Sequence, residues 1–395
     1  MHFENDIDKL SCLTKLEVDL LKRNEPNPDV YSLLSFQEAL RNCLLEYLNT
    51  PFLLSYKTSK SFKFLKKFYS YFKIKEKTPG TSQKIKNLPS LICHGYKALD
   101  ELLKNNIIDT YEKNLNIELI ETSLYSQLTP IEKYIFFTKK NLDEYLYASV
   151  VHGSGADLEL TPFSDLDTFL LIKKETIFSE KALNNFKKQW QKSLKYLYKF
   201  DCLQHHDHMV ATEVDLNLFP YHWLPPQILE DSKLVTGRGN LKPKIYKSSF
   251  NNIKVFFSLT QRFRDSNIES KKYNEYSLKN DISILSLLPA LYLQSIGIDT
   301  TKKESFSNEK LLSIDKDGFF KEISTIRQEW EVKNLSKFII SWRYNYYVRK
   351  FYLKYLIPPV GTTKITNNSF LKKEFLVSLN NIINKMSTNI IDAFN

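Results

Sequence analysis

The chain has 395 residues and a formal net charge of +11, with 42% hydrophobic and 26% charged residues. This composition excludes an intrinsically disordered chain, and the length favours two or three domains with a sizeable core. No run approaches the ~20 apolar residues of a membrane-spanning helix, and the first ten residues lack the apolar centre of a secretion signal. We therefore expect a protein with no membrane partner that is cytoplasmic, or secreted by a route that leaves no such signal. Its basic charge suits an anionic partner, although lysine-rich helices can also be basic simply because they are solvated.

The first 125 residues are predicted to form an N-terminal helical region. Apolar residues from Leu33 to Leu48 recur at helical spacing, and a second helix is expected from Ser90 to Asn105. Between them, the segment 62–77 is dense in lysine and aromatic residues. Its aromatics fit the buried stripe of an amphipathic helix, although aromatics among lysines can also stack on nucleic-acid bases. Scattered cysteines without a CxxC pair indicate free thiols in a reducing compartment. They are Cys12, Cys43, Cys93 and Cys202.

Residues 126–240 show the alternation of helices and strands that is typical of an α/β core. A helix is expected from Thr129, with Pro130 at its first position, to about Asn141. The pattern then predicts strands at 145–151 and 167–172, a helix at 179–200, and a third strand within 209–219.

Residues 241–395 are expected to form a C-terminal helical domain, since the helical pattern returns at Pro225 and lasts to the end. One strongly apolar helix opens at Tyr276, and another covers Ile339 to Phe351. The overlapping segment 342–355 again mixes basic and aromatic residues. The predicted architecture is an α/β core with a small mixed sheet, flanked by helical regions at both ends.

The most informative segment joins the first two predicted strands. An apolar strand is followed by Gly153-Ser154, and Asp165-Leu166-Asp167 then leads into the next strand. A Gly-Ser turn that opens a helix offers backbone N–H groups to phosphate oxygens. Because alternate strand residues share a face, Asp165 and Asp167 present two carboxylates toward one cation, and Mg²⁺ prefers such ligands. The alternative is a serine that caps a helix and two solvated turn aspartates.

This pattern resembles the polymerase-β-like nucleotidyltransferase superfamily, and most closely the nucleotidyltransferase domain of bacterial PII uridylyltransferases and their relatives. Glu159, Pro162 and Ser164 match further positions of that motif. The relatives usually carry an arginine shortly after Gly-Ser, whereas this chain has Ala156-Asp157. The resemblance covers the region 128–241 and implies a nucleotidyltransferase core, in which an anion-binding cation is missing or comes from elsewhere.

The resemblance also implies roles for individual residues. Gly153 and Ser154 would bind the triphosphate, and the carboxylates of Asp165 and Asp167 would hold Mg²⁺ or Mn²⁺. The family uses a third carboxylate on a later strand, and we expect Asp215 to be this catalytic, metal-binding residue. Glu213 and Asp207 remain alternatives. A helical region of this superfamily often supplies lysines to the phosphates, and the candidates, which could equally be solvated helix-end lysines, are Lys279, Lys302 and Lys303.

A second unusual feature is the run from Cys202 to His208, which contains three histidines and an aspartate. It concentrates residue types that bind zinc, but the paired Cys/His spacing of a structural zinc site is absent. His206 and His208 could share a strand face and point into the catalytic cleft. The run could also be a polar loop before a buried strand.

The predicted reaction moves an NMP from an NTP to an acceptor and releases pyrophosphate. The resemblance favours a protein side chain as acceptor, while the charge favours RNA, for example tRNA. A small-molecule acceptor of the antibiotic type is a further alternative. The rival hypothesis is a binding or interaction protein on a catalytically degenerate nucleotidyltransferase fold, which the missing arginine would suit.

Overall fold

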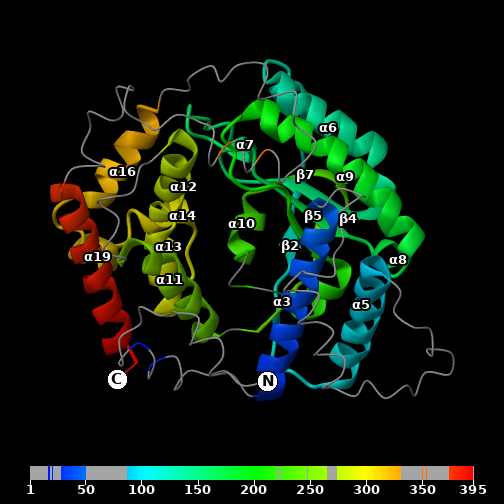
Figure 1. The fold of residues 1–395 in the computed structure, drawn as a ribbon, viewed down its shortest axis with the longest axis horizontal. Helices are drawn as coiled ribbons and strands as arrows, with labels where there is room; N and C mark the ends of the chain where they lie inside the picture. Colours follow the sequence, from blue (N-terminus) through cyan, green and yellow to red (C-terminus); the bar gives the residue numbers. More distant parts are fainter. Residues whose placement is uncertain are drawn as a thin grey trace.

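A computed structural model describes most of the chain (Figure 1). The described residues are 28–49, 87–219, 224–246, 248–264, 274–330 and 373–394, together with positions 17, 20, 221, 349 and 353. The basic and aromatic segment 62–77 lies outside them, as does most of the segment 342–355 and of the helix expected from Ile339.

The centre of the fold is a mixed sheet of five strands in the order β3-β7-β4-β5-β6. β4 pairs antiparallel with both β5 and β7, whereas β5–β6 and β3–β7 are parallel pairs. Two short antiparallel pairs, β1–β9 and β2–β8, flank the sheet. The strands are β1 (Tyr111–Glu112), β2 (Leu115–Asn116), β3 (Glu118–Leu119), β4 (Leu146–Val151), β5 (Thr168–Ile172), β6 (Met209–Thr212), β7 (Lys233–Gly237), β8 (Asn240–Leu241) and β9 (Lys244–Ile245).

The two strands that carry the motif are buried on both faces. Every residue of β5 is buried, and so is every residue of β4 except Tyr147. Leu170 and Ile172 belong to one hydrophobic cluster, while Phe169 and Leu171 belong to another on the opposite face. The nearly continuous apolar sequence of these strands follows from this double coverage.

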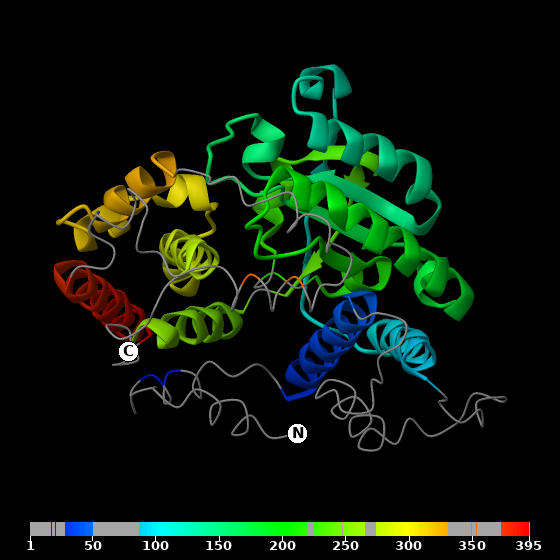
Figure 2. The ribbon, with the colours of Figure 1, turned by 45° about the horizontal axis from the view of Figure 1, so that its top comes forward.

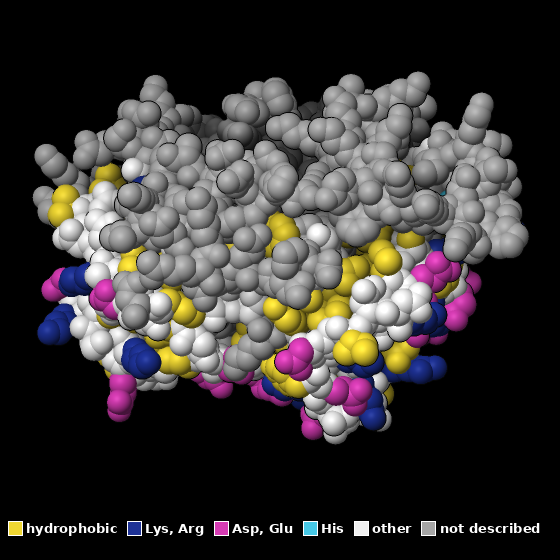
Figure 3. Space-filling model, turned by 90° about the horizontal axis from the view of Figure 1, so that it is seen from below, with side chains coloured by type: hydrophobic (Ala, Val, Ile, Leu, Met, Phe, Trp, Pro, Cys, Tyr) yellow, Lys and Arg dark blue, Asp and Glu magenta, His cyan; other side chains and the backbone are white. Residues whose placement is uncertain are grey.

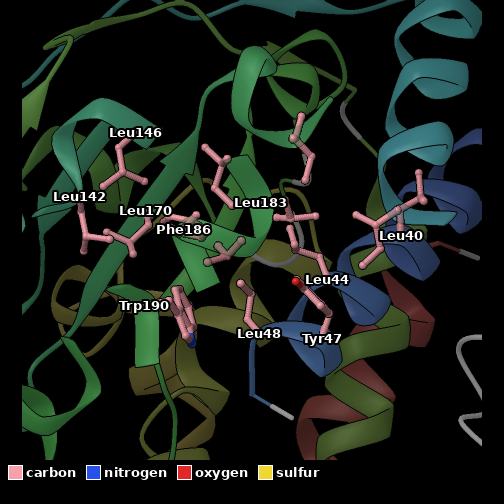
Figure 4. Packing of buried hydrophobic residues seen from close by; sticks show 14 of the residues in the cluster. Leu40, Leu44, Tyr47, Leu48, Leu142, Leu146, Leu170, Leu183, Phe186 and Trp190 are labelled. Carbon is pink, nitrogen blue, oxygen red and sulfur yellow. The ribbon is translucent and has the colours of Figure 1, made fainter. Parts of the chain in front are cut away.

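Helices from the N-terminal half share the first of these clusters with the sheet. Figure 4 shows Leu44 and Leu48 of α3 beside Phe186 and Trp190 of α9, so the hydrophobic core runs across residue 125 without a break. The elements on this side are α3 (Pro28–Asn49), α5 (Leu88–Asn105), η2 (Thr122–Tyr125), α6 (Thr129–Asn141), η3 (Asp143–Tyr145), α8 (Lys174–Ile177) and α9 (Glu180–Phe200). Shorter helices of the core are α7 (Ser154–Asp157), η4 (Glu213–Asn217) and α10 (Pro226–Glu230).

The C-terminal helices form a second group with its own hydrophobic cluster (Figure 2). They are α11 (Ser249–Arg264), α12 (Glu275–Leu285), α13 (Leu288–Ser295), α14 (Lys302–Ser305), α15 (Glu309–Ile314), α16 (Phe319–Gln328) and α19 (Lys373–Asp392). Phe163 and Leu203 reach into this cluster from the core. The motif segment and the histidine-rich loop are therefore packed against the C-terminal helices.

The predicted fold class is confirmed at the level of a mixed α/β core with a small mixed sheet and helices at both ends. The expectation of helices alone after Pro225 is wrong, because β7 pairs with β4 inside the sheet. The apolar helix that opens at Tyr276 is divided in two, since α12 ends at Leu285 and Pro289 lies in the first turn of α13. Within the described residues, no helix is both long and apolar enough to span a membrane.

Candidate active site

The turn after β4 is packed directly against the second aspartate of the motif. The amide of His152 donates to the Asp167 carbonyl at 3.0 Å, and Gly153 then turns the chain with a φ of +62°. A Cβ at position 153 would lie 3.1 Å from Oδ2 of Asp167, in a backbone conformation that side chains rarely allow. Glycine therefore lets α7, which begins at Ser154, approach the Asp167 carboxylate.

Asp165 and Asp167 are held together by the anchored residue between them. Leu166 is fully buried, and the side-chain amide of Gln204 binds its N–H and its carbonyl at 3.3 and 3.1 Å. Because alternate residues of an extended segment share a side, the two carboxylates lie opposite Leu166. Both reach the same imidazole: His206 Nε2 is 3.5 Å from Asp165 Oδ2 and 3.0 Å from Asp167 Oδ1. The structure thus brings together the two carboxylates that the motif placed side by side.

A further buried carboxylate, Asp201, is linked to Asp165 through Lys279. Asp201 follows the last turn of α9 and is buried. Lys279 of α12 lies between two acids, with its Nζ 2.7 Å from Asp165 Oδ1 and 2.6 Å from Asp201 Oδ2. Burial together with the charge of Asp165 raises the pKa of Asp201 to about 6, although Lys279 opposes the shift. Burial alone would lower the pKa of Lys279, but the two carboxylates outweigh it and raise that pKa.

Two of the three histidines in the loop before β6 face the aspartates. Besides His206, His205 places its Nδ1 3.2 Å from Asp165 Oδ2. His208 lies elsewhere, because its ring nitrogens bond the hydroxyls of Thr168 at 2.6 Å and Ser193 at 2.8 Å in the buried core. Burial lowers the pKa of His208 to about 3, so that this ring is neutral. The expectation that His206 and His208 share one face toward the cleft is therefore wrong.

This arrangement offers two kinds of ligand atom to a divalent cation. Carboxylate oxygens from Asp165 and Asp167 would suit Mg²⁺ or Mn²⁺. However, Asp165, His205 and His206 each offer one ligand atom within 4.8 Å of the others, so two of these three atoms are imidazole nitrogens. Imidazole suits zinc and neighbouring transition metals better than it suits Mg²⁺. The described residues thus offer carboxylate oxygens of the kind that Mg²⁺ prefers and, beside them, imidazole nitrogens of the kind that zinc prefers.

Cations from the C-terminal helices also face the aspartate pair. Lys302, the first residue of α14, and Arg327 of α16 both interact electrostatically with Asp165 and Asp167. Burial and the charge of Arg327 lower the pKa of Lys302 to about 7, against the opposing effect of the two aspartates. The Arg327 guanidinium lies 5.1 Å from the Phe163 ring, and its Nε is buried without a hydrogen-bond partner among the described residues. Arg327 therefore provides positive charge that Ala156-Asp157 does not, while Lys302, with a pKa of about 7, is charged only in part at neutral pH.

Lys303 does not face the pair. Its Nζ binds both carboxylate oxygens of Glu159 at 2.9 and 2.8 Å, and both side chains are exposed. Lys303 therefore lies on the surface beside the motif loop. This agrees with the alternative prediction, that it is a solvated lysine at a helix end.

Asp215 does not join the carboxylates at the site. The predicted third strand stops at Thr212, and Asp215 lies in η4, where its Oδ2 accepts hydrogen bonds from the Thr212 N–H at 2.6 Å and hydroxyl at 2.9 Å. Its Oδ1 accepts a 2.7 Å bond from Gln37 of α3. Both oxygens are thus used in capping a helix and joining two elements. The carboxylate that shares a partner with Asp165 is Asp201, through Lys279.

The two alternatives for the third carboxylate also have other partners. Glu213 accepts a 3.0 Å hydrogen bond from the Lys174 N–H at the start of α8. Asp207, in the loop before β6, accepts a hydrogen bond from the Tyr198 hydroxyl. Both carboxylates therefore have partners away from the aspartate pair.

The chain matches no family model, no curated protein and no solved structure.

Three residues that sequence reasoning missed complete the site. Asp201 and Arg327 bring charge to it, and Arg349 shapes the histidine loop by donating to the carbonyls of Cys202 at 3.1 Å and Gln204 at 2.7 Å. The sequence did contain one signal for Asp201. The residue lies at the end of a long amphipathic helix and next to a histidine-rich run, and such a position indicates a loop that leads to the edge of the sheet. No local pattern distinguishes Arg327 or Arg349, because their partners are far away along the chain.

Proposed function

We propose that this protein is a nucleotidyltransferase, which moves an NMP from an NTP to an acceptor and releases pyrophosphate. The observation that carries the proposal is the packing of the Gly153 turn against Asp167, with Asp165 beside it. The short loop, the paired carboxylates and the edge of a mixed sheet are the parts that the resemblance associates with this reaction.

The charges around the pair support a polyphosphate substrate. A triphosphate needs positive charge along its length, and Lys302 and Arg327 approach the aspartates from the C-terminal helices. A divalent cation bound by the carboxylates would neutralise the charge that develops on the transferred phosphorus group. Lys302 is half-buried, and a phosphate bound beside it would favour the charged form of its amine. We assign Lys302 and Arg327 to the phosphates, in the place of the arginine that the motif lacks.

The rival function, a nucleotidyltransferase fold that binds without catalysis, is favoured by one observation. Lys279 holds Asp165 and Asp201 together, and in doing so supplies the positive charge that a metal ion would otherwise bring to these two carboxylates. A site neutralised in this way could bind a nucleotide without a metal ion. The two hypotheses differ in whether a divalent cation is needed for nucleotide binding and in whether nucleotide is consumed.

The acceptor in the proposal is a protein side chain or RNA. The net charge of +11 favours an anionic macromolecule. On the face seen in Figure 3, acidic and basic side chains of the described residues alternate, with no area of one sign. Arg349, in the basic and aromatic segment 342–355, is buried over the Tyr198 ring and is not available to bind RNA.

The test separates chemistry from binding. Each α-labelled NTP is incubated with the protein and a lysate, and label is then measured in the protein and RNA fractions. Asp165→Asn and Asp167→Asn should each reduce transfer by ~100-fold or more, because each removes charge that the transition state requires. Lys303→Met, at the exposed pair beside the motif, is the matched control and should transfer normally. Full transfer by either aspartate variant would refute the proposal, whereas NTP binding without any transfer would support the rival function.

A further inference from the structure

The histidine loop brings two imidazole nitrogens to one carboxylate oxygen, which the motif does not require. His205 Nδ1 lies 3.2 Å and His206 Nε2 3.5 Å from Oδ2 of Asp165. We propose that Asp165, His205 and His206 bind a single transition-metal ion of the zinc class, in preference to Mg²⁺ or Mn²⁺. The inference rests on the proposed function only for the role of the ion, since binding of the metal can be measured without nucleotide.

The two rings are oriented as metal ligands are. The Nδ1 of His206 lies 3.0 Å from the Asp207 carbonyl, to which its N–H donates, and this leaves Nε2 to face the aspartates. Histidines that bind metals usually fix their orientation by such a bond from the other ring nitrogen. The Nδ1 of His205 is buried and makes no hydrogen bond to any described residue. The rings are nearly perpendicular, at 84° with centroids 4.9 Å apart, so their nitrogens approach Asp165 from different directions.

The loop that carries these histidines is fixed before any ion binds. Arg349 bonds the carbonyls of Cys202 and Gln204 and stacks over the Tyr198 ring at 3.8 Å. The side chain of Gln204, next to His205, is bonded to the backbone of Leu166 between the two aspartates. Both sides of the donor set are therefore tied to one another, and preorganised ligands bind a metal with little loss of conformational freedom.

Lys279 limits the site to one ion. Its Nζ contacts Oδ1 of Asp165 and Oδ2 of Asp201, so that only Oδ2 of Asp165 faces the histidines. Two nitrogens and one oxygen, with a further position open toward Asp167 or a ligand, form the kind of donor set that catalytic zinc sites have. A hard, strongly hydrated ion such as Mg²⁺ gains less from imidazole than zinc does.

The test uses the full chain, stripped of metal with a chelator and dialysed, and measures Zn²⁺, Mn²⁺ and Mg²⁺ binding separately. We expect one Zn²⁺ per chain, with Mg²⁺ and Mn²⁺ bound more weakly. His205→Ala and His206→Ala should each weaken Zn²⁺ binding by more than ~100-fold, because the loss of a mere outer-shell partner already costs about 10–100-fold. His94→Ala on α5 is the matched control and should bind Zn²⁺ normally. Co²⁺ serves as an optical probe, since nitrogen ligation in a site of low coordination number gives strong visible absorption.

Two outcomes would overturn the proposal. One is a chain that binds no Zn²⁺ at all, which would leave His206 as a protonated bridge between the aspartates. The other is Zn²⁺ binding that survives in both histidine variants. The variants His205→Asn and His206→Gln, which retain polar side chains of similar size, guard against a loss of fold, which circular dichroism would reveal. Metal binding without nucleotide transfer would refute the proposed function but not the metal site. Failure of the metal site and failure of the proposed function can therefore be distinguished.

Discussion

Replacing Lys279 with methionine should destabilise the protein strongly, because the side chain neutralises two buried acids. The exposed fractions of the side chains are 1% for Lys279, 9% for Asp165 and 6% for Asp201, so the value for buried ion pairs applies. Removing one partner of a buried pair typically costs ~3–5 kcal/mol, since the remaining charge is left uncompensated. With an m-value of about 3 kcal/mol per M of urea, the unfolding midpoint should fall by about 1–2 M.

The assay is equilibrium unfolding in urea, followed by fluorescence, of metal-free protein. Lys303→Met is the matched control, because it also removes a lysine that bridges the C-terminal helices and the motif loop, but its pair with Glu159 is exposed. We expect that control to leave the midpoint unchanged. Adding Asp201→Asn to Lys279→Met should restore part of the loss, since one of the two like charges is then removed. An unchanged midpoint in Lys279→Met, or a double variant less stable than it, would refute the role assigned to this ion pair.

Three further predictions test other parts of the structure. Gly153→Ala should lower the free energy of unfolding by ~1–2 kcal/mol, measured in urea, and should weaken NTP binding. A residue with a side chain is strained at this φ, and its Cβ would crowd Asp167. Unchanged nucleotide binding would contradict the packing of the turn. Asp215→Asn should lower the free energy of unfolding by about 1–3 kcal/mol, while the protein that remains folded still binds nucleotide. The new amide N–H₂ would face N–H groups that now donate to the carboxylate. Burial raises the pKa of three thiols to about 12, 12 and 11, so these should resist alkylation at pH 8 until the protein is unfolded, and rapid labelling of the native protein in a mass-spectrometric assay would show the burial to be wrong. The thiols are those of Cys43, Cys93 and Cys202.

Patterns in the sequence predicted the helices and strands whose formation depends on residues close together in the chain. The helix from Thr129 to Asn141 was visible in its proline at the first turn and its apolar spacing, and the structure confirms it. The strands on either side of the motif were visible in their apolar runs, since they are buried on both faces. β7 was missed because its short segment Lys233–Gly237 has no alternation of its own and is held in the sheet by β4.

The site was predictable only where its residues are close in sequence. Asp165 and Asp167 belong to one motif, and the structure brings them together. Asp215 was assigned to a strand that ends three residues earlier, because the capping box of Thr212 and Asp215 starts a helical turn there. The position of Asp201 in the site depends on its ion pair with Lys279, which is 78 residues further along the chain. No pattern within either segment predicts that ion pair.

The anchoring of the histidine loop by Arg349 has a consequence for the order in which the molecule is made. Arg349 follows Gln204 by 145 residues, so at ~5–20 residues per second a ribosome needs about 7–30 s to synthesise the intervening chain. The strands β6 and β7 are made early in that interval, so the sheet is complete while the loop that holds His205 and His206 still lacks its partner. Lys279, Lys302 and Arg327 emerge in the same interval. The nascent protein therefore completes its sheet well before it completes the site, and the paired carboxylates acquire their counter-charges among the last events of folding.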